Sequence, residues 1–173
     1  DPVDAAGAAA TRSELARHEL HEVPLDSCGA DTQGAIGYQF QRALRNEFKR
    51  RGLTRQAATV VTQVLVDLKD PAFQKPSKPI GAFMTEADAQ AKIEKEGWAM
   101  VEDAGRGWRR VVASPKPQKI VERDAIQALI DGGFTVIAVG GGGIPVMENE
   151  QGELIGVEAV IDKDYASALL ANS

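Results

Sequence analysis

The sequence predicts an α/β protein with a mainly parallel sheet. Two segments, 59–66 and 134–139, are nearly continuously apolar and rich in β-branched residues, which is the pattern of strands buried on both faces. Segments whose apolar residues follow a helical spacing lie around them, as in βαβ connections. Of the 173 residues, 43% are hydrophobic and 26% are charged, which is typical of one globular domain and excludes disorder for most of the chain.

The first part of the chain predicts two helices. Residues 1–10 are small and acidic and are expected to be a tail, followed by a short helix over 11–21 and an extended segment at Pro24. A stronger helix is predicted from 31 to 51, with apolar residues along one stripe and Gly52 as its stop. The basic residues on its other face indicate a solvated surface. They are Arg42, Arg45, Lys49 and Arg50.

The middle of the chain, 67–112, is predicted to form an α+β insertion. Its first part, 67–83, contains three prolines and no regular period, so a long ordered loop is expected there. Thr85 and Asp88 then open a helix in a capping-box-like arrangement, and this helix ends before Gly97. Two short strands follow, at 98–101 and 108–112, and a glycine-bearing turn at 102–107 joins them.

The last third returns to an alternation of helix and strand. After a break at 114–117, apolar residues spaced as on one helix face start at Ile120, and Gly132 marks the end of this helix. The strand at 134–139 runs directly into four consecutive glycines. A final helix follows the segment 156–164 and reaches the end of the chain.

Charge and composition narrow the function classes. Lysine and arginine total 20 against 25 aspartates and glutamates, so the net charge of −5 argues against a nucleic-acid or anionic-membrane partner. Cys28 is the only cysteine and is interpreted as a structural thiol, not a nucleophile. The two histidines, His18 and His21, lie in one short segment, which disfavours histidine catalysis or a histidine-rich metal site. The acidic start of the chain and the lack of a long apolar run predict a cytoplasmic protein.

A run of four consecutive glycines, Gly140 to Gly143, predicts an anion-binding site. They follow a buried strand, so no Cβ covers the carboxyl edge of the sheet, where ligands of open α/β folds bind. Backbone N–H groups could there approach a phosphate or a carboxylate. The alternative is a merely tight turn, since the spacing is neither GxGxxG nor GxxxxGKS/T. If phosphate is bound, a lysine from elsewhere must supply the charge.

Two lysines are candidates for that role. Lys163 lies between Asp162 and Asp164 where a loop meets a helix, so the carboxylates could orient its ammonium toward a phosphoryl oxygen. The alternative is an ordinary helix N-terminus with aspartate caps. Lys78 lies between prolines, which lower the conformational entropy that is lost when its charge is presented to a ligand. The alternative is a solvated loop lysine. The charges at 102–110 could bind an oxyanion or form ion pairs across the two strands.

Together, these segments closely resemble the carbamate kinases of the amino-acid kinase family. The resemblance covers nearly all of residues 12–171, and its motifs are highly specific in combination. The matching stretches are 24–34, 36–38, 62–64, 70–74, 78–81, 102–109, 114–117, 140–145 and 156–164.

The resemblance implies an activity and an architecture. The activity is reversible phosphoryl transfer between ATP and carbamate, giving ADP and carbamoyl phosphate, with Mg²⁺ as cofactor and ATP formation in arginine catabolism. The implied protein is a cytoplasmic homodimer with small-molecule substrates and no nucleic-acid or membrane partner. Its fold would be an αβα sandwich with a core at 1–66 and 113–173, and a small protruding lid at 67–112.

The resemblance also implies the site residues. Lys163 is similar to the lysine that meets the transferring phosphoryl group, and Asp164 to the carboxylate that orients the active-site lysines. Lys78 is similar to the lysine that the lid brings over the site. No residue of this chain is assigned to a metal. The backbone amides that would line the substrate cleft belong to Gly140, Gly141, Gly142 and Gly143.

The family pattern extends beyond this chain at both ends. It begins with a strand and a GGNA-type phosphate loop, includes an NGPQVG segment, and continues after 156–164 into an adenine-nucleotide half with a further lysine in a GSM-type motif. The chain is therefore expected to be the central part of a carbamate kinase, with little or no turnover alone. The alternatives are a non-catalytic fragment or association module of that fold, and an amino-acid kinase with another small acid as acceptor.

Overall fold

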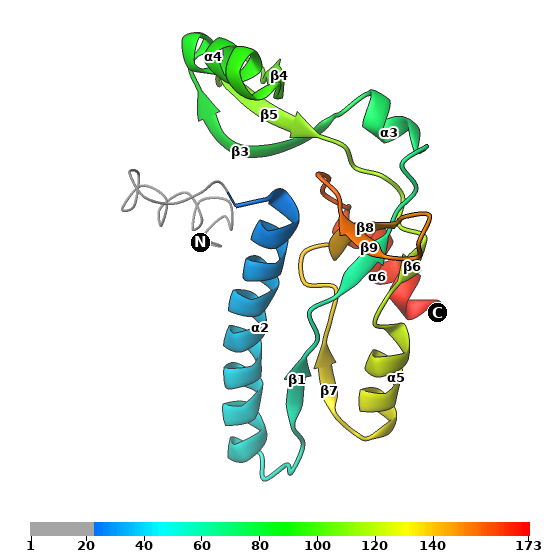
Figure 1. The fold of residues 1–173 in the computed structure, drawn as a ribbon. Coiled ribbons are helices and arrows are strands. Elements are labelled where there is room, and N and C mark those ends of the chain that lie inside the picture. The colour runs from blue at the N-terminus through cyan, green and yellow to red at the C-terminus, as the bar shows by residue number, and fades with distance from the viewer. Residues whose placement is uncertain (1–22) are drawn as a thin grey trace.

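The computed structural model describes residues 23–173 (Figure 1). The helix predicted over 11–21 and both histidines lie outside the described residues. The described part has a body of helices and strands, with a separate three-stranded antiparallel sheet beyond one end of that body. No helix in this part of the chain is long and apolar enough to cross a membrane.

The long helix α2 (Leu25–Arg50) begins directly after Pro24, so the predicted start at residue 31 is wrong. Proline suits this position because its fixed φ is close to the helical value and its missing N–H is not needed at a helix start. At the other end, the N–H of Leu53 donates to the carbonyl of Phe48 at 2.8 Å, and Gly52 adopts a φ of 68°. The predicted stop at this glycine is confirmed.

Two parallel strand pairs form the centre of the body. β1 (Ala57–Thr59) pairs with β7 (Thr135–Ile137), and β2 (Gln63–Leu65) pairs with β8 (Ile144–Glu148). Figure 1 shows α2 on one side of β1 and β7 and α5 (Arg123–Asp131) on the other. This order of helix, sheet and helix confirms the predicted α/β class with parallel strands.

The strand predicted at 59–66 is wrong as a single element. The chain leaves the first pair after Val60, whose N–H donates to the carbonyl of Ile137 at 2.9 Å, and then joins the second pair at β2. Between the two pairs, the N–H of Thr62 donates to the side chain of Gln33 at 2.7 Å. The apolar run continues through this break, so the sequence pattern does not reveal it.

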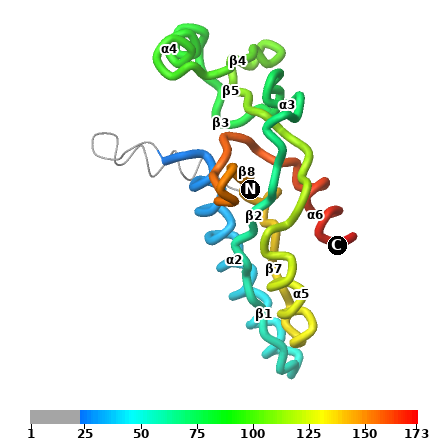
Figure 2. The backbone as a smooth tube through the Cα atoms, turned by 45° about the vertical axis from the view of Figure 1, so that its right-hand side comes forward, coloured from blue at the N-terminus to red at the C-terminus, as the bar shows by residue number. Residues whose placement is uncertain are grey.

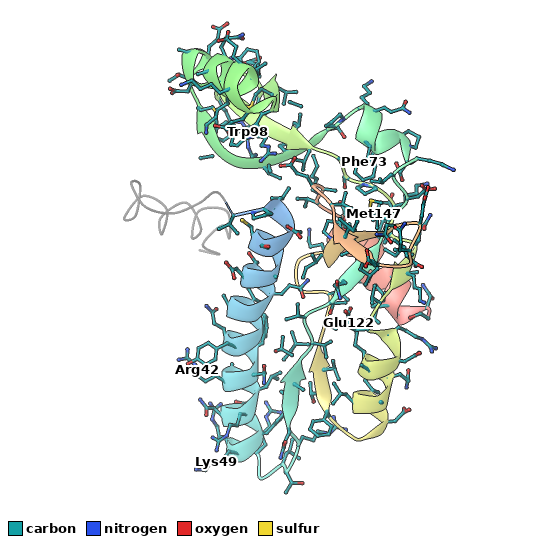
Figure 3. All side chains as sticks on the ribbon, in the orientation of Figure 1. Arg42, Lys49, Phe73, Trp98, Glu122 and Met147 are labelled. Carbon is teal, nitrogen blue, oxygen red and sulfur yellow. The ribbon has the colours of Figure 1, made fainter. Side chains whose placement is uncertain are left out.

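Antiparallel strands lie at both edges of the larger sheet. β6 (Lys119–Ile120) pairs with β2, and β9 (Leu154–Gly156) pairs with β8. Ile120 therefore lies in a strand and not on the predicted helix, which begins only at α5. The reason is Glu122, labelled in Figure 3, which accepts hydrogen bonds from the backbone and side-chain amides of Gln63 at 2.7 and 2.6 Å and holds the chain against β2.

The hydrophobic core lies between the larger sheet and the helices α5 and α6 (Lys163–Ala171). Val64 of β2 is fully buried, and Ile126 and Ala166 bring α5 and α6 onto it. Figure 2 shows α6 on the same side of this sheet as α5. Burying a side chain such as Ile126 contributes about 1.5–3 kcal/mol to folding. The N-terminus of α6 is thereby held at a fixed place beside the sheet.

The segment 67–112 contains the antiparallel sheet. β5 (Trp108–Val112) is its central strand, between β3 (Lys78–Met84) and β4 (Ala99–Glu102), and α4 (Glu86–Glu96) connects β3 to β4. The predicted α+β character of this segment and its two last strands are confirmed, each strand beginning within one residue of the prediction.

The long loop predicted at 67–83 is wrong, because it contains the short helix α3 (Pro71–Gln74) and all but the last residue of β3. Asp70 caps α3 by accepting from the N–H of Ala72 at 2.9 Å. Pro79 is tolerated in β3 because this is an edge strand, where a missing N–H costs little. Pro71 and Pro79 therefore lie in regular elements, and only Pro76 lies in the loop between them.

The helix α4 follows its sequence signals. Thr85 Oγ1 accepts from the N–H of Asp88 at 3.2 Å, which is the predicted N-cap. Gly97 ends the helix with a φ of 67°. The capping prediction is confirmed at both ends.

Candidate functional site

The glycine loop, Gly140 to Gly143, follows the end of β7 closely, as predicted, and leads into β8, a strand that the sequence pattern did not predict. The N–H groups of Gly142 and Gly143 donate to the carbonyl of Val139 at 2.7 and 3.0 Å. Gly141, Gly142 and Gly143 have φ values of 91°, 128° and 81°, which glycine alone adopts readily. Among residues 23–173, no partner accepts from the N–H groups of Gly140 or Gly141. These two amides can therefore donate to a bound anion.

The glycine loop lies against the backbone that leads into α6. A Cβ on Gly142 would be 2.3 Å from the carbonyl oxygen of Ile161 and 3.5 Å from the amide nitrogen of Lys163. A Cβ on Gly143 would be 2.1 Å from Cγ2 of Val64. Any other residue at these two positions would push the loop away from both neighbours.

Lys163 is the first residue of α6, and Asp162 is its N-cap. Asp162 Oδ1 accepts from the N–H of Asp164 at 3.1 Å, so the interpretation of this segment as a capped helix N-terminus is confirmed. The cap explains Asp162 but not the lysine beside it. A positive charge opposes the dipole of a helix at its N-terminus, and Lys163 is exposed. Helix stability therefore gives no reason for a lysine at this position.

Lys78, the first residue of β3, reaches the same segment from the antiparallel sheet. Its Nζ lies 3.2 Å from Oδ2 of Asp162, with the two side chains 35% and 34% exposed. The structure thus brings Lys78 to the residues around Lys163, although 84 positions separate Lys78 from Asp162. The resemblance assigned the orienting role to Asp164, which forms no ion pair with any residue in the described part of the chain.

The pKa of Asp162 is lowered from its ordinary value, first because the N–H of Asp164 donates to the carboxylate and then because of the hydrogen bond from Lys78. The carboxylate therefore stays ionised in the folded protein at pH values where it is partly protonated in the unfolded chain. It stabilises the fold above its ordinary pKa, and this stabilisation is lost as the pH falls through the lowered pKa.

We expect D162N to be slightly less stable than the wild type at neutral pH and equal to it at low pH. Asparagine caps a helix as well as aspartate does, so the substitution removes the charge and keeps the cap. The effect is small because the pair is exposed to solvent. Denaturant unfolding of both proteins from pH 7 to pH 3 measures it, and parallel stability curves over the whole range would contradict the expectation.

A second ion pair links the antiparallel sheet to the body. The guanidinium of Arg110 on β5 contacts the carboxylate of Glu158, and it also lies 4.2 Å from the ring centroid of Trp98, which Figure 3 labels. The Arg110 side chain is only 15% exposed. Glu158 and Asp162 belong to one segment, so both ion pairs fasten the sheet to the backbone that precedes Lys163.

The other charged candidates have local explanations. Arg106 pairs with Asp103 at 2.8 Å inside the turn, and Arg109 donates to the carbonyl of Gly81 at 2.9 Å. Arg106 is thus ion-paired, but within the turn and not across the two strands as the prediction had it. Partial burial and nearby aspartates raise the pKa of the Cys28 thiol, which keeps it protonated and fits the structural role predicted for it.

A hollow of about 750 Å³ lies between α2 and the segment 53–61. The predicted basic face of α2 contributes Arg42, Arg45 and Lys49 to its lining, and Figure 3 labels two of these side chains. None of the candidate site residues lines this hollow. The two lysines lie instead at the N-terminus of α6, and the glycine loop lies against the backbone that leads into this helix, so this loop is the candidate anion site.

No family model matches the chain. Curated relatives, in contrast, match most of it. The chain is 53% identical over 154 residues to a carbamate kinase of Pyrococcus horikoshii, a match that covers 89% of this chain and 49% of the relative. It is 54% identical over 158 residues to a carbamate kinase-like protein of Escherichia coli, covering 90% of this chain and 50% of the relative.

A solved structure has the same fold. The carbamate kinase from Giardia lamblia bound to AMP-PNP superposes with a TM-score of 0.86 at 46% identity, over 96% of this chain and 52% of that protein. The chain thus spans about half the length of the curated relatives and of the solved structure that it matches.

Proposed function

We propose that this chain, a member of the carbamate kinase family in the segment that it spans, is the part of a carbamate kinase that holds the transferring phosphoryl group. The reaction is reversible transfer between ATP and carbamate, giving ADP and carbamoyl phosphate. The family relationship supports this activity, since a carbamate kinase is 53% identical to the chain and another was solved with AMP-PNP bound.

The observation that carries the proposal is the convergence at the N-terminus of α6. Lys78 comes from the antiparallel sheet and Lys163 from the helix itself, and both lie next to Asp162. The glycine loop touches the same backbone and has open amides at Gly140 and Gly141. Two positive charges at the N-terminus of α6, beside a loop with two N–H groups that have no partner in the described part of the chain, suit a phosphoryl group, which carries charge on several oxygens.

The chemistry asks the protein for position and charge. In phosphoryl transfer the attacking and leaving oxygens must be in line, and the peripheral oxygens must be neutralised. We assign that neutralisation to Lys163 and Lys78, and the binding of the acid or phosphate oxygens to the amides of Gly140 and Gly141. Asp162 and Asp164 would keep the two ammonium groups oriented. The segment 67–112 would act as a lid, because it carries Lys78 to the site.

We further propose that Mg²⁺ accompanies the nucleotide. Within residues 23–173 no group of three potential ligand side chains is placed to hold a metal, so the ion would depend on phosphate oxygens and at most one or two carboxylates of this chain. We derive no step of the reaction through it. The family relationship also supports a cytoplasmic homodimer that works toward ATP in arginine catabolism.

A second candidate is a protein of this fold that lacks the activity or uses another small acid. The observation that favours it is the identity of 54% to a relative described only as carbamate kinase-like, which equals the identity to the carbamate kinase itself within one percentage point. Overall identity therefore does not separate the two functions.

An assay of ATP formation by the full-length protein separates them. We expect ATP from ADP and carbamoyl phosphate at a rate at least about tenfold higher than from ADP and acetyl phosphate, because a site that hydrogen-bonds an amino group discriminates against a methyl group. A preference for acetyl phosphate would indicate another acceptor. No ATP from either donor would contradict the proposed function.

A further inference from the structure

Two buried polar side chains lie directly behind the glycine loop. Thr62 is 0% exposed and Gln33 is 3% exposed, and they are the two polar residues that are buried in the described part of the chain. Gln33 lies on α2, and Thr62 lies at the break between β1 and β2. Burying a polar group is costly unless its hydrogen bonds are made.

Gln33 and Thr62 satisfy each other. The N–H of Thr62 donates to Oε1 of Gln33 at 2.7 Å, and Nε2 of Gln33 donates to the carbonyl of Thr62 at 3.1 Å. These two bonds stand in for the strand-to-strand hydrogen bonds that the chain lacks between the end of β1 and the start of β2. The position of the Thr62 backbone is therefore fixed from α2.

Thr62 in turn holds both ends of the glycine loop. Its Oγ1 accepts from the N–H of Val139 at 2.9 Å and donates to the carbonyl of Val60 at 2.8 Å. Its carbonyl accepts from the N–H of Ile144 at 2.9 Å. The residue before the loop and the residue after it are thus bonded to one threonine.

Val139 needs this support. Its φ of 60° lies in the left-handed region, which is strongly disfavoured for a β-branched residue. The strained valine is 4% exposed, and its carbonyl accepts from both Gly142 and Gly143. The hydroxyl of Thr62 therefore holds the one conformation of Val139 that points its carbonyl into the loop and leaves the next amides, of Gly140 and Gly141, open.

We propose that Thr62 and Gln33 are positioning residues for the anion site. Thr62 keeps Val139 in its strained conformation and so fixes the direction of the open amides, and Gln33 fixes Thr62. Neither residue touches the substrate. The part of the inference that concerns substrate rests on the proposed function, whereas the control of the loop conformation does not.

The test compares T62V and T62S in the full-length protein. Valine has the shape of threonine without the hydroxyl, so it leaves the N–H of Val139 unpaired in a buried place, whereas serine keeps the hydroxyl. We expect T62V to raise about tenfold the hydrogen-exchange rate of the four bonded amides of this loop, those of Val139, Gly142, Gly143 and Ile144, with the amides of α5 unchanged. We expect its KM for carbamoyl phosphate to rise about tenfold, and T62S to stay close to the wild type in both measurements.

The outcomes separate positioning from general stability. Unchanged loop exchange in T62V, or an equal rise in exchange throughout the protein, would overturn the inference. If T62V does not fold, Q33M decides, because it removes the support of Thr62 and keeps the hydroxyl; faster exchange confined to the loop supports the inference, and none overturns it. A wild-type protein without activity on carbamoyl phosphate would contradict the proposed function, while the exchange measurement still decides the role of Thr62.

Discussion

Replacing Lys163 by alanine in the full-length protein should reduce ATP formation from ADP and carbamoyl phosphate by about a hundredfold or more. The loss of one fixed group that meets developing charge typically costs about 10²–10³ in rate. Lys163 is exposed at the first position of α6, where its charge opposes the helix dipole. The thermal stability of the variant should therefore stay equal or rise slightly, which separates this loss from unfolding.

Two further variants sharpen the measurement. Lys119 is an exposed lysine on the edge strand β6 that forms no ion pair among the described residues, and K119A should leave the activity unchanged. K163R should recover only part of the activity, because a guanidinium keeps the charge but not the shape of an ammonium. Undiminished activity in K163A would contradict the role given to Lys163. A loss that appears equally in K119A would assign the effect to net charge.

The position of Lys78 depends on how the antiparallel sheet is fastened. Lys78 pairs with Val112, and Ile80 pairs with Arg110, so the two ion pairs to the body start from neighbouring strands at nearby register positions. They end at Glu158 and Asp162 of one segment. Movement of the sheet would therefore change both contacts together, and would carry Lys78 toward or away from the N-terminus of α6.

The parts of the fold that the sequence predicts are those with local signals. Thr85 and Gly97 mark both ends of α4 because a cap and a left-handed stop act within one turn of the helix. The run of glycines after an apolar segment marks the loop after β7 for a similar reason. The neighbours of Lys163 and Lys78 make these lysines candidates only, and the family resemblance supplies their roles, since neither the cap at Asp162 nor the prolines beside Lys78 carry a signal for phosphate.

The parts that the sequence did not predict depend on contacts between distant residues. The break in the segment 59–66 is made by Gln33, which is 29 positions away from Thr62, and the apolar pattern runs straight through it. A threonine in a β-branched run and a glutamine on a helix are unremarkable alone. Only their hydrogen bonds across the body connect them with the residues on either side of the glycine loop. In the same way, only the ion pair between Arg110 and Glu158 shows that these residues link the antiparallel sheet to the body.

Replacing Gly142 by alanine should affect the site more than any other single change in the glycine loop. Its φ of 128° is unsuitable for an L-residue, and a Cβ there would lie 2.3 Å from the backbone carbonyl oxygen of Ile161. Both atoms in this clash are held by the main chain and cannot be relieved by a side-chain rotation. The loop must therefore shift away from the segment that leads to Lys163. A misplacement of about 1 Å at a reacting centre can cost about a hundredfold in rate.

The matched control is Gly152, which also has a positive φ, of 79°, but has only the end of the Glu148 side chain near its Cβ position. G152A should therefore show the cost of backbone strain alone, about 1–2 kcal/mol of stability, with activity unchanged. G142A should lose more stability than G152A and about a hundredfold in kcat/KM for carbamoyl phosphate. Since Gly152 lies close to the left-handed region and Gly142 lies outside it, the difference between the variants measures the contact between the glycine loop and the backbone before Lys163 together with the greater strain at Gly142. Equal stabilities and equal activities in the two variants would show that this contact does not hold the site together.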